Sequence, residues 1–107
     1  MMTAAEVESR VHSEIADQWD RWTPHGLDLR RCVVRPPRLE TYISHAGGRE
    51  VPLGLWLVVE EDPDTHSGYE VFYDAQEDVF GLGTVGKDGR RYYLGGYGSL
   101  WRTLECM

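Results

Sequence analysis

The stretch Glu50–Glu61, with the sequence EVPLGLWLVVEE, decides the fold of this chain. Because successive side chains of a β-strand point to opposite faces of a sheet, its odd-numbered positions form one uniformly apolar face. That face comprises Val51, Leu53, Leu55, Leu57 and Val59. The opposite face is apolar only around Trp56 and Val58. We therefore predict a central β-strand with one buried face and one partly covered face.

The chain has the length and charge of a small acidic protein. Its 107 residues correspond to one domain, and a hydrophobic fraction of 41% is normal for a globular fold. The formal net charge is −7, from 11 Lys and Arg and 18 Asp and Glu residues. This charge argues against sequence-independent binding to nucleic acids or anionic membranes, since both need many basic groups. It permits a basic protein partner, although solubility alone also explains it.

Three features of the sequence indicate a cellular compartment. The first residues, MMTAAEVESRVHSE, contain no apolar run of signal-peptide length. No apolar run elsewhere approaches the ~20 residues of a membrane span. Cys32 and Cys106 lie far apart without CxxC spacing, so we interpret them as free thiols of a reducing compartment. The sequence therefore predicts a cytoplasmic protein.

The N-terminal segment has the pattern of an amphipathic helix. Thr3–Glu6 has the spacing of a capping box, in which a hydroxyl N-cap is followed three residues later by Glu. One helical stripe comprises Val7, Val11, Ile15, Trp19 and Trp22. We predict a helix over Ala4–Trp22 that is ended by Pro24 and Gly26. The two tryptophans are expected to pack this helix onto the sheet; the alternative is that they stack on a ligand.

Two strands are predicted before the central one. The stretch Leu27–Arg35, LDLRRCVVR, alternates imperfectly, and a bulge near Arg30–Arg31 would reconcile its two halves. Pro36–Pro37 is expected to break the sheet, because proline lacks an amide donor. The second predicted strand is Leu39–Ser44, and the turn residues His45–Gly48 connect it to the central strand.

The remainder of the chain predicts a meander followed by a helix. The further strands, at hairpin spacing, are Tyr69–Asp74, Val79–Val85 and Arg90–Leu94. Gly95–Gly96 is expected to break the sheet, and Ser99 to cap a short C-terminal helix. The predicted fold is a single α+β domain over residues 1–107. It has an N-terminal amphipathic helix, a five- to six-stranded, mostly antiparallel sheet and a short C-terminal helix.

No motif in the sequence indicates catalysis, a metal or a cofactor, and we predict none. Gly81–Asp88, GLGTVGKD, satisfies GxGxxG, but the following residues are β-rich instead of the helix that a phosphate loop needs. We interpret it as a hairpin. The loop Asp62–His66 spaces its acids as calcium loops do but lacks their final bidentate Glu, which favours a solvated loop. The four histidines lack standard metal spacing and are expected at the surface or in turns.

Acidic residues gather in two predicted loops and form the candidate binding site. The set comprises Glu60, Glu61, Asp62, Asp64, Asp74, Glu77 and Asp78. We expect the two groups to lie at the same end of the meander and to merge into one negative rim near Tyr69 and Tyr73. Such a rim would steer and anchor a basic protein by charge complementarity. The alternative is an ordinary solvated rim.

The second half of the chain, Tyr69–Met107, resembles small bacterial immunity-type proteins. The stretches that carry the resemblance are YEVFYD, FGL after an acidic turn, and the closing segment YGSLWRTLECM. The resemblance implies a non-enzymatic inhibitor that masks a toxin by binding it. It assigns no role to an individual residue.

These observations lead to three functional hypotheses. The first is a cytoplasmic, non-enzymatic protein-binding module, such as an immunity-type inhibitor of a basic partner like a nuclease toxin. The second is a small enzyme or ligand-binding module with a pocket between sheet and helix; its candidate residues are Cys32, His25, Trp19, Trp22 and Trp56. The third is a homodimer whose open sheet edges pair.

Overall fold

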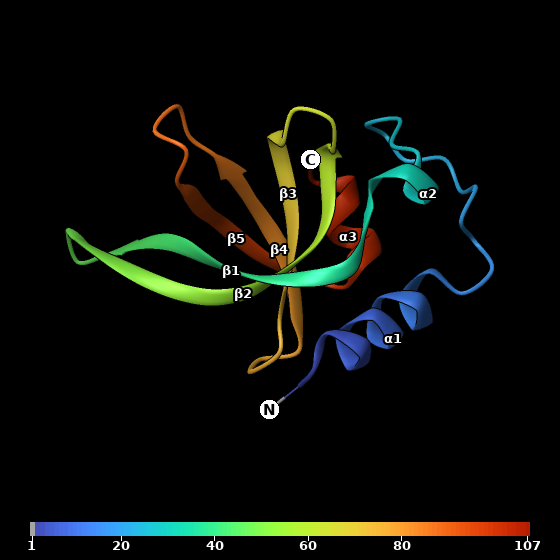
Figure 1. Ribbon diagram of the computed structural model, residues 1–107, viewed down its shortest axis with the longest axis horizontal. Helices are drawn as coiled ribbons and strands as arrows, with labels where there is room; N and C mark the ends of the chain where they lie inside the picture. The colour runs from blue at the N-terminus through green and yellow to red at the C-terminus, as the bar shows by residue number, and fades with distance from the viewer. Residues whose placement is uncertain (1) are drawn as a thin grey trace.

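The computed structural model describes residues 2–107 and shows an α+β fold (Figure 1). The helices of this part are α1 (Ala4–Ile15), α2 (Leu29–Cys32) and α3 (Leu100–Glu105), and none of them is long and apolar enough to cross a membrane. The strands are β1 (Val33–Ala46), β2 (Arg49–Asp62), β3 (Ser67–Asp74), β4 (Val79–Val85) and β5 (Arg91–Gly98). The predicted helices at both ends of the chain and the sheet between them are confirmed.

The five strands close into a small barrel. Each strand from β1 to β5 pairs antiparallel with the next. β5 then returns to β1 and pairs with it in parallel, at Tyr42–Arg91 and Ile43–Tyr92. The sheet is therefore mixed and closed, whereas the sequence indicates a mostly antiparallel sheet with open edges. Closure therefore pairs part of β1 with part of β5, the two strands that would otherwise form the open edges of the sheet.

Helix α1 begins as predicted but ends earlier. The Thr3 hydroxyl accepts the Glu6 N–H and the Glu6 carboxylate accepts the Thr3 N–H, so the capping box is present. The helix ends at Ile15, because the backbone leaves the helical region at Ala16, with φ 53° and ψ −118°. The prediction that the helix continues to Trp22 is therefore wrong.

The positive φ at Ala16 leads to a stability prediction. A non-glycine residue in such a backbone conformation lowers the free energy of unfolding by about 1–3 kcal/mol, and glycine avoids this strain. Glycine in turn lowers the free energy of unfolding by about 0.4–1 kcal/mol, because it makes the unfolded chain more flexible. Ala16→Gly should therefore raise the free energy of unfolding by about 1 kcal/mol, measured by urea denaturation. Ser9→Gly, at an exposed position inside α1, is the control and should lower it. A loss of stability in both variants would contradict the strain at Ala16.

The segment before β1 is a helical turn instead of a strand. Leu29–Cys32 forms α2, and its N-cap Asp28 accepts the Arg30 N–H at 3.1 Å. The first and last residues of this turn are both buried, since residues three apart share a helix face. That spacing produces the imperfect alternation of Leu27–Arg35, so the predicted strand with a bulge near Arg30–Arg31 is wrong.

Two residue pairs that were expected to break the sheet lie within strands. Pro36–Pro37 lies in β1, where the register against β2 shifts between Val33 and Arg38, so the missing amide donors fall in an irregular part of the ladder. Gly95–Gly96 lies in β5 and pairs with β4, because ladder hydrogen bonds need no side chain. The predicted turn before the central strand is confirmed, since β1 ends at Ala46 and β2 begins at Arg49.

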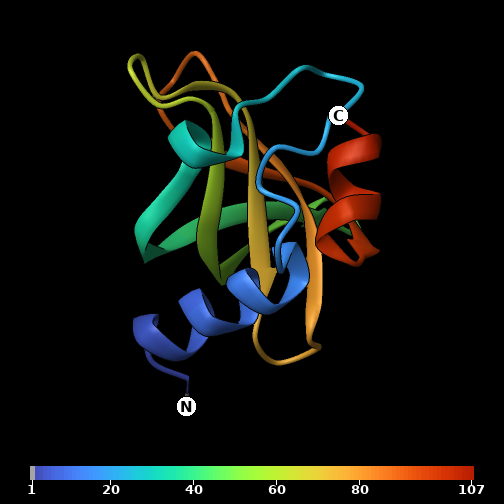
Figure 2. The ribbon, with the colours of Figure 1, turned by 90° about the vertical axis from the view of Figure 1, so that its right-hand side faces the viewer.

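The larger apolar core lies between the helices and the sheet. Figure 2 shows α1 and α3 lying over the strands. The buried members from the helices include Val7, Val11, Ile15, Leu100 and Leu104, and those from the sheet include Val59, Val71, Phe80 and Leu82. The predicted stripe of α1 is thus confirmed as far as Ile15.

The central strand β2 is buried over only part of its length. Within Leu55–Val59 every residue except the partly exposed Trp56 is buried. Val51 is 37% exposed, because β2 pairs with β3 only from Trp56 onward and the end of the β1–β2 hairpin extends past the other strands (Figure 1). The predicted burial is therefore confirmed only from Leu55 onward. The single face is not, because the register shift between Leu57 and Val59 puts Leu55 and Val59 in different apolar clusters.

Two glycines of β4 leave room for aromatic rings inside the barrel. The rings of Tyr42 and Phe72 contact each other, with centroids 5.5 Å apart. A Cβ on Gly83 would lie 2.6 Å from Cε2 of Tyr42, and one on Gly81 would overlap the ring of Phe72. Packing thus explains Gly81 and Gly83 of the GLGTVGKD stretch, which forms the second part of β4 and the turn into β5, the hairpin that we predicted.

Filling the space at Gly83 should destabilise the barrel. Gly83→Ala forces the ring of Tyr42 to move, and overpacking of this kind costs about 1–3 kcal/mol of unfolding free energy. Gly54→Ala is the control, because a Cβ at Gly54 meets no atom within 4 Å; its effect should stay within about 0.5 kcal/mol. Denaturant titration of both variants measures this difference, and equal effects would refute the packing argument.

Candidate functional site

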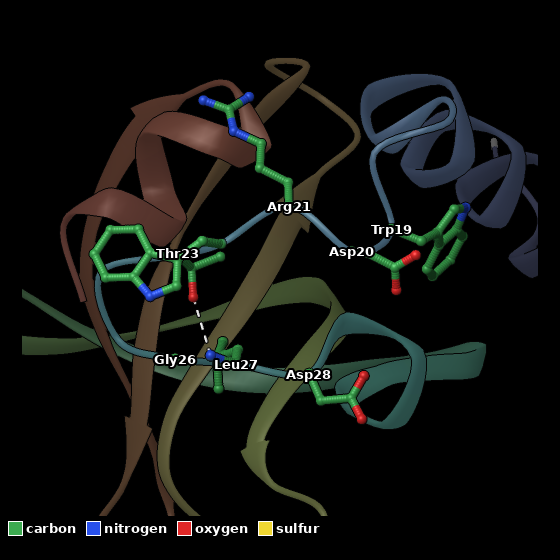
Figure 3. A pocket seen from close by; sticks show the side chains of 8 residues that line it. Trp19, Asp20, Arg21, Thr23, Gly26, Leu27 and Asp28 are labelled. Carbon is green, nitrogen blue, oxygen red and sulfur yellow. Dashed lines mark hydrogen bonds between the residues drawn. The ribbon is translucent and has the colours of Figure 1, made fainter.

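A loop rich in tryptophan connects α1 to α2. We name residues 16–28 the tryptophan loop. Successive turns hold its backbone, through hydrogen bonds from Gln18 N–H to Ile15 O, from Arg21 N–H to Gln18 O and from Gly26 N–H to Thr23 O. Thr23 is buried, and its hydroxyl oxygen accepts the Leu27 N–H at 2.9 Å (Figure 3). The loop therefore presents its other side chains on a fixed backbone.

Two pockets share Trp22 in their linings. The first has a volume of about 260 Å³ and is lined by residues 19–23 and 26–28 of the loop (Figure 3). The second has a volume of about 270 Å³ and is lined by residues 21–24 and by Trp101, Leu104 and Glu105 of α3. Trp22 contributes to both pockets and is 76% exposed. Three of the four tryptophans thus gather on one surface, which we name the tryptophan surface.

Two of these tryptophans are covered by arginines of the same chain. The Arg35 guanidinium lies 4.8 Å from the ring centroid of Trp19, and that of Arg21 lies 4.3 Å from the centroid of Trp101. The Trp101 indole N–H donates to the Glu14 carbonyl at 2.9 Å, which fixes its ring. Among residues 2–107, no Lys or Arg stacks on Trp22.

Carboxylates border the tryptophan surface. Asp20 accepts hydrogen bonds from Arg30 at 3.1 and 3.2 Å, and this guanidinium holds the pKa of Asp20 below its ordinary value. Asp28 caps α2, and the Glu105 carboxylate lies 3.9 Å from the Arg21 guanidinium. A surface that combines aromatic faces with carboxylates favours the binding of cationic groups.

A second group of polar side chains runs from the surface into the barrel. We name it the charged ladder, and it comprises His66, Glu60, Arg38, Glu40, Arg91, Glu70 and Tyr42. Its outer end is His66, whose Nδ1 lies 2.6 Å from Glu60 Oε2. Glu60 also accepts from Arg38 at 3.3 Å, and Arg38 lies 3.6 Å from Glu40. The ladder thus connects an exposed histidine to the interior.

The inner end of the charged ladder is a buried glutamate. Arg91 donates to Glu40 at 3.2 Å and to Glu70 Oε1 at 3.0 Å, and the Tyr42 hydroxyl donates to the same Oε1 at 2.9 Å. Glu70 is 2% exposed, and its Oε2 is buried without a hydrogen-bond partner among the described residues. Burial raises the pKa of Glu70, against the opposing effects of Tyr42 and Arg91.

The acidic residues predicted as one rim lie at opposite ends of the sheet. Asp62 ends β2 and Asp64 follows it in the β2–β3 connection, whereas Asp74 ends β3 and is followed by Glu77 and Asp78 in the β3–β4 connection (Figure 1). These are consecutive turns of the meander, and consecutive turns lie at opposite ends. The expectation of one merged rim is therefore wrong, while the role of these residues in binding stays a prediction.

Most of these acids make contacts within the chain. At the β2–β3 end, Glu60 is 4% exposed inside the barrel, Glu61 pairs with His25, and Asp64 pairs with Arg31. The side chains of Asp62 and Asp74 accept backbone N–H groups of their own turns.

At the β3–β4 end, Asp78 accepts from Tyr73 and Arg10, which lowers the pKa of Asp78, while burial and this contact raise the pKa of Tyr73 to about 12. Within residues 2–107 the Glu77 carboxylate has no hydrogen bond or ion pair.

The pocket expected between sheet and helix is filled by the apolar core. Cys32 is buried there, and burial raises the pKa of its thiol. Trp56 packs against the same core, and His25 pairs with Glu61 instead of meeting them. In the part of the chain that the structure describes, no three His, Cys, Asp or Glu side chains are arranged to hold a metal ion.

Comparisons with known proteins add no family to this description. No protein-family model, curated protein or solved structure matches the chain.

One sequence signal could have identified the charged ladder. Glu40, Glu70 and Arg91 each stand two positions before an aromatic residue, in the pairs Glu40–Tyr42, Glu70–Phe72 and Arg91–Tyr93. Residues two apart on a strand share a face, so an inward aromatic implies an inward charge. The tryptophan surface had no comparable signal, because α3 supplies part of it.

The buried carboxylate of Glu70 should give stability a specific pH dependence. A raised folded pKa means that its contribution is greatest below about pH 4.5, the ordinary value for Glu, and is lost as the pH rises through the raised pKa. Glu70→Gln cannot ionise, so its stability relative to the native chain should increase over that window. Urea denaturation from about pH 4 to about pH 8 measures the difference. Glu77→Gln, at an exposed carboxylate, is the control; a Glu70→Gln curve parallel to the native one would contradict this assignment.

Proposed function

We propose that this protein is a cytoplasmic, non-enzymatic binding module that captures a basic protein partner on its tryptophan surface. Its specific form would be an immunity-type inhibitor that masks a toxin, in line with the resemblance of Tyr69–Met107. The observation that carries the proposal is Trp22, which is 76% exposed between two pockets. Large aromatic side chains and arginines dominate the energetics of protein interfaces.

Charge supports a basic partner on this surface. The chain has a net charge of −7, and exposed carboxylates of Asp20 and Glu105 border Trp22. Opposite charges speed association and select partners. Pairing within the chain does not separate the two sites, since Glu61 and Asp64 pair with His25 and Arg31 while Asp20 and Glu105 pair with Arg30 and Arg21. The exposed indole of Trp22 is what favours the tryptophan surface.

A second candidate function is a small enzyme or ligand-binding module that uses the barrel interior. The observation that favours it is Glu70, whose buried Oε2 lacks a partner among residues 2–107. Such groups with raised pKa values cluster at functional sites. Thermal-shift screening of small ligands against the native chain and Glu70→Gln tests it, since a ligand of this site should stabilise only the native chain.

Homodimerisation remains a third proposal, which solution mass at increasing concentration tests.

The proposal predicts different effects for two matched charge reversals. Trp22→Ala should weaken capture of the partner about tenfold, because it removes the aromatic anchor of the surface. Glu105→Lys should weaken it to a similar extent, because it puts a positive charge beside a basic partner. Glu77→Lys makes the same change in net charge at an exposed acid of the β3–β4 turn, and Leu94→Ala truncates an exposed apolar side chain of β5. Both controls should bind normally.

The measurement has two stages. Proteins captured from the native lysate at low and high salt are identified, and the Kd of the purified partner is then measured by calorimetry for each variant. Loss of binding in Glu77→Lys with normal binding in Trp22→Ala would refute the tryptophan surface and favour the acidic turns.

A further inference from the structure

The tryptophan surface already contains two cation–aromatic contacts within the chain. Arg21 stacks on Trp101 while its guanidinium lies 3.9 Å from Glu105 and donates to Gln18 at 3.2 Å. Arg35 stacks on Trp19. A guanidinium above an indole therefore occurs twice on this surface, and in the Arg21–Trp101 contact the Glu105 carboxylate lies beside it.

The third indole of the surface has a free face. Trp22 is 76% exposed, and within residues 2–107 no Lys or Arg stacks on it. The first pocket beside it is bordered by Asp20 and Asp28, and the second by Glu105. The carboxylates of Asp20 and Glu105 each contact an arginine of the chain, Arg30 and Arg21, but both are largely exposed. An incoming cation can therefore still reach an aromatic face and an acid.

We propose that Trp22 is the docking platform for an arginine side chain of the partner. This inference rests on the proposed function, because it names the chemistry that the tryptophan surface recognises. Arginine fits better than lysine, since its planar guanidinium stacks on an indole and hydrogen-bonds to a carboxylate at the same time. The charge of −7 favours such a group over an acidic or neutral one.

A peptide of three arginines and the isosteric peptide of three citrullines test the inference directly. Citrulline keeps the shape of the side chain and removes its charge. The readout is the set of indole N–H signals in a two-dimensional nitrogen–proton NMR spectrum, assigned with single Trp→Phe variants. Titration with the arginine peptide should shift the Trp22 signal, and the citrulline peptide should not.

Two variants separate stacking from general attraction to an acidic protein. Trp22→Leu keeps an apolar side chain and the net charge but removes the aromatic face, so it should weaken binding of the arginine peptide roughly three- to fivefold. Trp22→Phe keeps a smaller aromatic face and should retain part of the binding. Equal affinity in the native chain and Trp22→Leu, or equal shifts with both peptides, would overturn the inference.

Failure of this inference is distinguishable from failure of the proposed function. If Trp22→Ala loses the protein partner while the arginine peptide leaves Trp22 unshifted, the binding surface stands and the arginine platform is refuted. If the peptide shifts Trp22 while Trp22→Ala binds the partner normally, the proposed function is refuted, and with it the place of the platform in partner binding.

Discussion

Arg91 forms ion pairs across the point at which the barrel closes. This residue lies at the parallel pairing of β5 with β1, and its guanidinium joins Glu40 of β1 to Glu70 of β3. The parallel ladder itself contains only two residue pairs. A guanidinium that bridges two carboxylates across it adds charge-assisted hydrogen bonds where backbone pairing is sparse. These groups face the same interior as the Tyr42 and Phe72 rings, so closure and inner packing form one unit.

The same contacts show why a small domain retains an acid in its interior. Removing a carboxylate from water costs several kcal/mol, and the attraction of a guanidinium repays this only with good geometry and full hydrogen bonding. Glu70 has good contacts at Oε1 and none at Oε2 among the described residues. The Glu70 carboxylate therefore positions Arg91 and Tyr42 at the expense of some stability. In the second candidate function, Glu70 would be the residue that contacts the ligand.

Much of the sheet could be predicted from the sequence, because apolar alternation and turn residues are local signals. β4 has the predicted bounds Val79–Val85, and Ser99 caps α3.

The secondary-structure prediction failed where different local structures share one pattern. The apolar spacing of Leu29–Cys32, for example, fits a helical turn and a bulged strand equally. It also failed at Ala16, where a residue with high helix propensity adopts a positive φ. Barrel closure is a contact between Tyr42 and Arg91, far apart in sequence, and no local pattern encodes it. Trp19 and Trp22 were singled out by the sequence, but chiefly as residues that pack a helix onto the sheet. Trp19 does pack against the core, whereas Trp22 is 76% exposed, so that expectation is wrong for Trp22. The shared surface with Trp101 depends on the packing of α3, which no local pattern encodes.

The glycine beneath the Tyr42 ring also couples residue size across the barrel. The ring of Tyr42 from β1 fills the space that a side chain at Gly83 of β4 would need, whereas at Gly81 the backbone carbonyl of Gly95 blocks a side chain whatever stands at position 72. A change at position 42 or 83 must therefore be matched at the other. Distant relatives should share the sum of volumes at 42 and 83, even where the individual residues differ, and should keep glycine at 81. These two constraints form a fingerprint by which related chains can be found when overall sequence similarity is too low to detect.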